Sequence, residues 1–327
     1  MAVAMSFGVP NYSGMLFNKG NTRTPFSTLI GARPLQTNHV EFACGQYYTG
    51  GGTGTQPNIS ESASLTAPTP TSATRTQMQN VTQIFQESLG VSYAKMSNMG
   101  TLSGINVAGQ VANPASELDF QVAVKMQKIA RDIEYCFIRG QYNKATSDVT
   151  VNQTRGMIEA ISTNNIDANG KALNLWTVAE AMKSIDEQNA PTTGLVLLVD
   201  GITMMQISAD AVTNGMSNAP ADRTVNGINI KTLVTPFGDI GIVKGEFLPS
   251  GTALIANIDV ISPVFQPVPG KGNFFLEELS KVGAGTTYQI FGQAGLDHGP
   301  EWYHAKITNI DTTFTAPTNG GASSAKV

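Results

Sequence analysis

The chain has few residues of the kinds that carry metal or redox chemistry. Only two cysteines and three histidines occur among its 327 residues. Cys44 and Cys136 lie far apart without the spacing of a zinc site or a disulfide framework, so both are expected to be reduced thiols. His298 and His304 fall in DHGPEWYH. A metal or acid–base site there is the less favoured interpretation, and a turn that enters a strand is the favoured one.

The sequence also lacks the motifs that mark common enzymes. It contains no H-E-x-x-H, no Walker A pattern, no G-x-S-x-G and no set of kinase motifs. The GGGTG at 50–54 is not followed by a helix that could bind a phosphate. Asp200 follows the apolar run at 195–199, but the glycine fingerprint of a dinucleotide site is missing. We therefore expect no enzyme activity, no cofactor, and no catalytic or metal-binding residues.

Charged residues are scarce, at 13% of the chain, whereas soluble domains typically have about 25%. This indicates a surface that other chains partly cover, although a neutral, loop-rich globule fits equally well. The net charge of −4 removes the overall signature of a nucleic-acid-binding protein but leaves a local basic patch open.

Long apolar runs are absent as well. The longest strongly apolar run, LVLLV at 195–199, is far shorter than the roughly 20 residues that cross a bilayer. The N-terminus has no basic segment followed by a long apolar run, so no secretory signal is indicated. We expect neither export nor a membrane partner.

The first part of the chain is rich in turn-forming residues. Residues up to about 40 show no sustained period and indicate an irregular arm with short anchors. The Thr-, Ser-, Gly- and Pro-rich stretch at 45–80 disfavours a helix and has few charges. This predicts an extended hairpin or loop that lies on another surface, with a free linker as the alternative. Residues 80–94 then predict a returning strand.

A long helix is predicted over 114–139, about 39 Å at ~1.5 Å per residue. Asn113 and Pro114 are favoured at a helix start, and Gly140 marks its end. One apolar stripe runs along it, formed by Leu118, Val122, Met126, Ile129, Ile133 and Phe137. Charged residues lie off the stripe, among them Lys125 and four whose spacing allows pairing: Lys128, Arg131, Asp132 and Glu134.

These four charges have two possible meanings, an acid–base pair or the polar face of a structural helix. Lys128 with Asp132 and Arg131 with Glu134 have spacings that allow ion pairs within one helix. Asp132 and Glu134 point to different sides, and no nucleophile is near them in sequence. We therefore interpret them as a polar face that takes part in subunit assembly.

The second half of the chain predicts a compact α/β unit at 174–257. The pattern at 177–180 resembles a capping box, with Thr177 as the helix N-cap. A buried strand, a second helix and two further strands follow. After residue 259, FFLEELS, TTYQIFGQ and EWYHAKITNI indicate strands again. Helix, insert and returning strands suggest one layer interrupted by a second domain.

The order of these segments resembles the major capsid proteins of tailed bacteriophages, which share the Hong Kong 97-type fold with encapsulins. The resemblance rests on degenerate blocks in a shared order: TPFSTLIG (24–31), NVTQIFQESLGVS (80–92), ARDIEYCFIRG (130–140), TRGM (154–157), FGDIGIVKGEFLP (237–249) and EELSKVGAGTTYQIFGQAGLDHGPEWYHAKI (277–307).

The resemblance implies an α+β fold with six parts. They are an N-terminal arm (1–35), an extended loop (36–79), a peripheral domain (80–172) with its spine helix (114–139), an axial α/β domain (173–256), returning peripheral strands (257–314) and a flexible tail (315–327). The loop residues expected to contact other subunits are Gly50, Gly54, Glu61 and Arg75.

The resemblance also implies function. Subunits would form hexamers and pentamers that close an icosahedral virion shell around packaged double-stranded DNA, contacted non-specifically, in the cytoplasm of a bacterial host. A portal, and a cement protein as a further partner, are implied. The chain begins almost at the arm without a helical pro-segment, so a separate scaffolding protein is expected.

Some relatives cross-link their subunits covalently through a lysine in the extended loop. This chain has no lysine between Lys19 and Lys95, so we expect no such cross-link. The alternatives to a capsid protein are an encapsulin-like or tail-tube protein and, less favoured, an α/β enzyme at the Asp200 corner or an adhesin.

Overall fold

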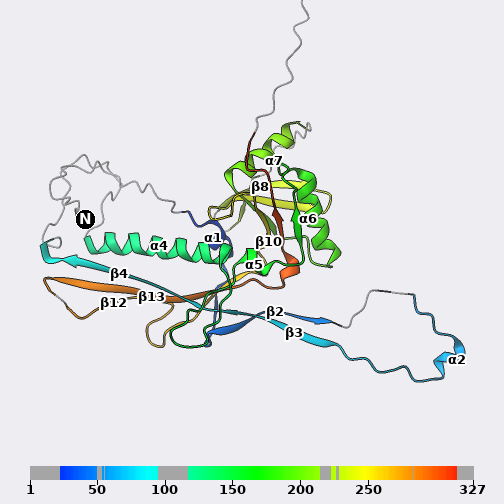
Figure 1. Cartoon of the computed structure of the whole chain (residues 1–327), viewed down its shortest axis with the longest axis horizontal. Helices are drawn as coiled ribbons and strands as arrows, with labels where there is room; N and C mark the ends of the chain where they lie inside the picture. Colours follow the sequence, from blue (N-terminus) through cyan, green and yellow to red (C-terminus); the bar gives the residue numbers. More distant parts are fainter. Residues whose placement is uncertain are drawn as a thin grey trace, which may run out of the picture.

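The structure, a computed structural model, describes residues 23–49, 54, 56–94, 117–213, 222–225, 228–281 and 283–314. These residues form a five-stranded sheet, a seven-stranded sheet and a two-stranded hairpin that projects away from both (Figure 1). The helices are α1 (Pro25–Ile30), α2 (Glu61–Ser64), α4 (Glu117–Arg139), α5 (Met157–Ala160), α6 (Leu175–Glu187), α7 (Gly201–Thr213) and the 3-10 helix η2 (Glu301–Tyr303).

The five-stranded sheet is built around one long strand. Its strands are β1 (Leu35–Gln36), β4 (Gln83–Ser92), β11 (Ser262–Phe265), β12 (Phe274–Glu278) and β13 (Gly285–Asp297). β13 pairs antiparallel with β4 on one side and with β12 and β11 on the other, and β1 pairs with β11. Alternate residues of β4 are buried, namely Phe85, Leu89 and Val91, and they pack with Ile129 of α4. Helix α4 therefore covers one face of this sheet.

The seven-stranded sheet has its two central strands fully buried. Its order is β5 (Asn165–Asp167), β14 (Ala305–Thr308), β10 (Ala253–Asn257), β6 (Leu195–Val199), β9 (Gly238–Lys244), β8 (Ile228–Thr235) and β7 (Asp222–Val225). β6 and β10 are buried along their whole length because both faces are covered. In β6, Val196 and Leu198 pack with α1 and the end of α4, whereas Leu195, Leu197 and Val199 pack with α6.

Two strands of this sheet lie outside the range predicted for the α/β domain. The prediction of 173–256 leaves out β5 and β14, and it assigned β14 to the returning strands of the other layer. β14 instead pairs with β10 and β5, and its Ala305 and Ile307 are buried in the core beside α6. A four-residue strand carries no pattern that selects its partner sheet, so tertiary packing decides.

The hairpin consists of β2 (Glu41–Thr49) and β3 (Thr74–Val81), paired antiparallel. Between Cys44 and Gln46 the register shifts at a bulge. Gly45 there has a φ of 60°, and an added Cβ would lie 2.9 Å from the carbonyl carbon of Gly299. Both conditions favour glycine. The paired strands of the expected hairpin are thus confirmed, and its contact with another surface stays a prediction.

Helix α4 ends where the sequence predicts, at Arg139 followed by Gly140. The predicted start, at Asn113 and Pro114, lies outside the described residues. At the end, an added Cβ on Gly140 would lie 2.3 Å from the carbonyl oxygen of Thr154. The backbone of Gly156 also donates to Gly140, at 2.9 Å. Glycine is needed here for this close approach of two backbone segments.

Two local predictions are wrong. Helix α6 begins at Leu175, and its N-cap is Asn174, whose Oδ1 accepts from the amide of Thr177 at 2.8 Å. The predicted cap Thr177 is thus inside the helix, because Asn174 is the stronger capping residue. In the hairpin tip, Ser60 caps the one-turn helix α2, although turn-forming residues had suggested no helix there.

Candidate functional site: assembly surfaces

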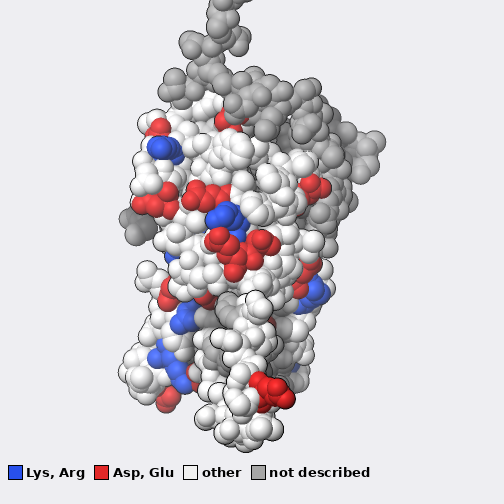
Figure 2. All heavy atoms as spheres, turned by 90° about the vertical axis from the view of Figure 1, so that its right-hand side faces the viewer, with Lys and Arg blue, Asp and Glu red and all other residues white. Residues whose placement is uncertain are grey.

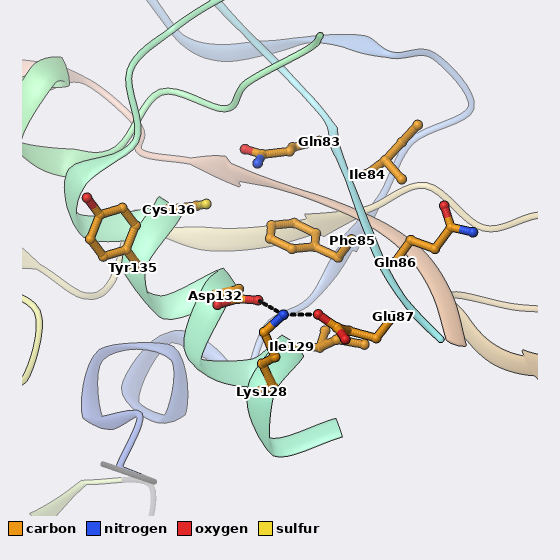
Figure 3. A pocket seen from close by; sticks show the side chains of 10 residues that line it. All are labelled: Gln83, Ile84, Phe85, Gln86, Glu87, Lys128, Ile129, Asp132, Tyr135 and Cys136. Atoms are coloured by element: carbon orange, nitrogen blue, oxygen red, sulfur yellow. Dashed lines mark hydrogen bonds and ion pairs between the residues drawn. The ribbon is translucent and has the colours of Figure 1, made fainter. Parts of the chain in front are cut away.

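The polar face of α4 carries the predicted ion pair of Lys128 with Asp132, at 4.0 Å. The stronger partner is Glu87 on β4, to which both Lys125 and Lys128 donate. Figure 3 shows Lys128 between Glu87 and Asp132. Glu87 is the residue that sequence reasoning missed. It stands in register with the inward-facing Phe85 and Leu89, and an acid on an inward face indicates a basic partner on the covering helix.

Glu134 does not belong to the polar face to which it was assigned. Its side chain is fully buried, and its Oε1 accepts from the amide of Phe26 at 2.8 Å. Its Oε2 accepts from the amide and the hydroxyl of Ser27. Burial raises the pKa of this carboxyl, although these hydrogen bonds oppose that effect. The carboxylate thus holds the first turn of α1, whose backbone amides have no helical partner.

The contact of α1 with α4 holds residues 25–30 against the rest of the fold. Phe26, Leu29 and Ile30 are buried in the core with Phe137 and Ile138 of α4. On the exposed side, Arg23 lies 3.9 Å from Glu246. The prediction of the arm contained apolar anchors but no partner for them. The partner of α1 comes from residues more than a hundred positions away, so no local pattern shows it.

The predicted loop residues lie at the projecting end of the hairpin. Gly54, Glu61 and Arg75 are exposed, and Gly50 lies outside the described residues. Two apolar side chains beside α2 are also exposed, Ile59 and Leu65. Figure 2, in which the hairpin points toward the viewer, shows a mostly uncharged surface there.

The turn that contains His298 and His304 has a structural role. The Nδ1 of His304 accepts from the amide of Asn257 at 3.1 Å, and its Nε2 lies 2.7 Å from the carbonyl oxygen of His298. Both rings are buried, and burial lowers the pKa of each to about 4. The interpretation as a turn that enters a strand is confirmed, since β14 follows directly.

The other residues considered for catalysis or metal binding also have structural positions. Asp200 accepts from the amide of Thr203 at 2.8 Å and so caps α7. Cys44 and Cys136 are free thiols, and burial raises the pKa of Cys136 to about 11. Across the described ranges, no three His, Cys, Asp or Glu side chains are arranged to hold a metal ion. Nor does any helix in those ranges have the length and apolar character needed to cross a bilayer.

Solved shell proteins are similar to the chain over nearly their whole length. The Cyanophage A-1(L) capsid has a TM-score of 0.62 at 11% identity, covering 93% of this chain and 97% of that chain. The SrpI encapsulin of Synechococcus elongatus PCC 7942 has a TM-score of 0.60 at 10% identity, covering 91% and 93%. The capsid of Myoviridae Phage XM1 has a TM-score of 0.55 at 10% identity, covering 94% and 99%. The fold is therefore the Hong Kong 97-type fold.

The fold alone does not separate a phage capsid from an encapsulin, because both are similar to the chain to the same degree. The family model of the SU10 major capsid protein matches residues 2–311. The chain belongs to this family and is a bacteriophage major capsid protein, a structural protein of the capsid. None of the curated proteins compared with the chain matches it.

Proposed function

We propose that copies of this chain form hexamers and pentamers that close an icosahedral shell around packaged double-stranded DNA. Beyond the family, the observation that supports this is the hairpin of β2 and β3, which extends past the rest of the molecule (Figure 1). A two-stranded hairpin alone is marginal in water. Exposed apolar side chains at its tip gain stability when another subunit covers them. The hairpin is thus a clamp between subunits.

The finer parts of the proposal concern partners and chemistry. A separate scaffolding protein, a portal and a cement protein would complete the shell, which assembles in the cytoplasm of a bacterial host. DNA would be contacted without sequence specificity. The chain would do no catalysis and need no cofactor. The contacts between subunits would come from Gly54, Glu61 and Arg75 on the hairpin and from the polar face of α4.

Deletion of residues 50–74 tests the clamp. We expect assembly to be lost while the helix content of the subunit, measured by circular dichroism, is retained. A matched control replaces the same residues by a Gly/Ser linker of equal length. If the clamp acts through its tip residues, this control also fails to assemble. Assembly of either variant at the wild-type level would contradict the clamp.

Electron microscopy of the purified chain, with and without its scaffolding protein, tests the shell itself. Uniform shells or capsomers are expected. Monomers that bind a nucleotide and never assemble would overturn the proposal. Unboiled shells should run as monomers in a denaturing gel, because residues 20–94 contain no lysine for a covalent link. A ladder of covalent oligomers would contradict this part.

A further inference from the structure

One short segment joins the two large sheets of the molecule. Residues 298–304 run from the end of β13 in the five-stranded sheet to the start of β14 in the seven-stranded sheet. We call them the junction loop. The loop contains two of the three histidines of the chain, His298 and His304, and both side chains are fully buried. Two titratable rings at this place link their protonation to the way in which the sheets are joined.

The junction loop also contacts the base of the hairpin. At the bulge of β2, an added Cβ on Gly45 would lie 2.9 Å from the carbonyl carbon of Gly299 and 3.0 Å from the nitrogen of Pro300, so the two backbones touch. Further along β2, the ring of Tyr47 packs edge to face on Trp302, with 5.1 Å between the ring centroids. These contacts help to set the direction in which the hairpin leaves the body.

His304 links the end of β10 to the start of the junction loop only while its ring is neutral. Its Nδ1 accepts from the amide of Asn257, the last residue of β10, and its Nε2 lies 2.7 Å from the carbonyl oxygen of His298. A carbonyl oxygen only accepts, so the one proton of the neutral ring is on Nε2. A second proton would go to Nδ1 and face the N–H of Asn257. The hydrogen bond to β10 would then be lost.

His298 has no acceptor for a second proton. Its Nδ1 lies 2.8 Å from the carbonyl oxygen of Gly299, so the proton of the neutral ring is on Nδ1. Its Nε2 is buried and, across the described residues, has no hydrogen-bond partner. Protonation there would create a buried, charged N–H group without an acceptor, which is costly. A charged ring is therefore compatible only with a junction loop that has opened to water.

The charged groups around the two rings leave burial as the largest effect. Asp297 and Glu301 lie on the same segment, Arg155 approaches from the loop before α5, and Cys44 on β2 is a neutral thiol whose pKa is raised by burial. Glu301 favours a charged His298, whereas Arg155 opposes it. Burial outweighs both and lowers the pKa of each ring to about 4.

We propose that the junction loop is a pH-sensitive switch, closed while His298 and His304 are neutral and opened by their protonation. In the closed form the hairpin and the two sheets have the arrangement of Figure 1. In the open form the contacts of Gly45 and Tyr47 with the loop are lost. The hairpin and the seven-stranded sheet then turn against the five-stranded sheet while each keeps its own strands. The switch belongs to the single subunit and does not depend on the proposed shell.

The direction and size of the response follow from the two rings. The closed form is favoured above about pH 6.5 and is weakened as pH falls toward 4, because only the open form binds the protons readily. A ring that regains its ordinary pKa on opening raises the ratio of open to closed subunits roughly 50-fold between pH 7 and pH 4.5. The effects of the two rings multiply.

Distances between two spin labels test the switch in the full-length chain, kept dilute so that it does not assemble. The labels are attached to Thr76→Cys, exposed on β3, and to Lys183→Cys, exposed on α6, in a Cys136→Ser background. We expect one narrow distribution of distances at pH 7.5 and a second, broader population at pH 4.5, with an unchanged circular dichroism spectrum. A distribution that does not change with pH would overturn the switch.

Variants assign the response to the two rings. In His298→Gln/His304→Gln each side chain offers a donor and an acceptor but does not titrate, so the narrow distribution should persist at pH 4.5. His39→Gln changes an exposed ring, and Asp297→Asn removes another titrating group of the same region. Both should respond as the wild type does. A response that survives in the double variant, or that is lost in Asp297→Asn, would overturn the assignment to the histidines.

The reactivity of Cys44 gives a second readout. Its thiol is buried beside the junction loop, with Sγ 3.5 Å from the carbonyl oxygen of Leu296, so it should react with a dithiodipyridine only when the loop opens. In Cys136→Ser, the rate relative to that of glutathione in the same buffer should rise by roughly tenfold or more between pH 7 and pH 4.5.

The control for this readout is Val196→Cys, buried in β6, with both native cysteines replaced by serine. It should stay protected at pH 4.5, because the strands of each sheet are retained in the open form. An unchanged rate at Cys44 would overturn the switch. An equal gain at both thiols would also overturn it, since the whole subunit would then be unfolding.

Discussion

At the scale of single residues, we expect Glu134 to contribute most to stability among the four charged residues of α4 that were assigned to assembly. Glu134→Ala removes the acceptor for the amides of Phe26 and Ser27. An unsatisfied buried donor costs about 1–3 kcal/mol, so we expect a loss of roughly 2–5 kcal/mol in the free energy of unfolding. Glu134→Gln keeps one acceptor oxygen and should lose less. The measurement is chemical denaturation of the purified chain.

The control for this prediction is Asp132→Asn on the same helix. Asp132 is half exposed, and its ion pair with Lys128 is long. Exposed pairs contribute about 0–1 kcal/mol, so this change should be close to neutral. Equal losses for Glu134→Ala and Asp132→Asn would contradict the assigned role of Glu134.

The two buried histidines make stability depend on pH. Burial lowers the pKa of His298 and His304 to about 4, from an ordinary value of 6.5. Between these values the unfolded chain binds protons that the folded chain does not, so stability falls as pH falls from about 6.5 to 4. The effect reaches at most about 3 kcal/mol for each ring.

Unfolding free energies measured at pH 7, 6, 5 and 4 test this dependence. His304→Gln keeps a donor for the carbonyl of His298. It should reduce the slope of unfolding free energy against pH by the amount that corresponds to about one bound proton. His39→Gln changes an exposed ring and should leave the curve unchanged. A His304→Gln curve as steep as that of the wild type would show that His304 is not the titrating group.

At the scale of elements, Ile133 joins the two halves of the molecule. It packs both against the core around α1 and the seven-stranded sheet and against the core between α4 and β4. Ile133→Asp places a carboxylate at this junction. Burial of an unpaired charge with loss of packing exceeds about 4 kcal/mol, so we expect the subunit not to fold. Circular dichroism and protease resistance measure this.

Met126 provides the matched control, because it belongs to the same predicted stripe but is 40% exposed. Met126→Asp should leave a folded subunit. If Met126→Asp prevented folding as Ile133→Asp is expected to do, the assigned difference in burial between these two positions of the stripe would be contradicted.

The elements that the sequence predicts well are those with local signals. The end of α4, the apolar residues at its centre and the hairpin followed from periodicity and turn composition. The misses depend on distant partners. In the sequence Glu134 resembles a solvent-facing charge, but in the fold α1 covers it. In the same way β14 resembles any short strand in the sequence, and only its pairing with β10 assigns it to a sheet. In the candidate site, Ile59 and Leu65 looked ordinary because exposure is not visible in composition.

At the scale of the whole molecule, the low charge has a consequence for the shell. The described hairpin tip has Glu61 as its one charged residue at 56–73, and the chain is only 13% charged. Contacts made by such a surface depend on apolar burial, which salt does not screen, whereas ionic contacts weaken as the Debye length shortens to about 3 Å at 1 M salt. Assembly through the hairpin should thus tolerate high salt.

We therefore expect assembled shells to remain intact when NaCl is raised from about 0.1 to about 1 M, as measured by sedimentation and electron microscopy. Low concentrations of urea, which weaken apolar and backbone contacts, should release subunits while each subunit stays folded. Glu61→Gln provides a control, because it removes the one charge of the tip and should shift the salt dependence only slightly. Dissociation of the wild-type shell by salt alone would mean that ion pairs between subunits hold the shell together and that the apolar tip is secondary.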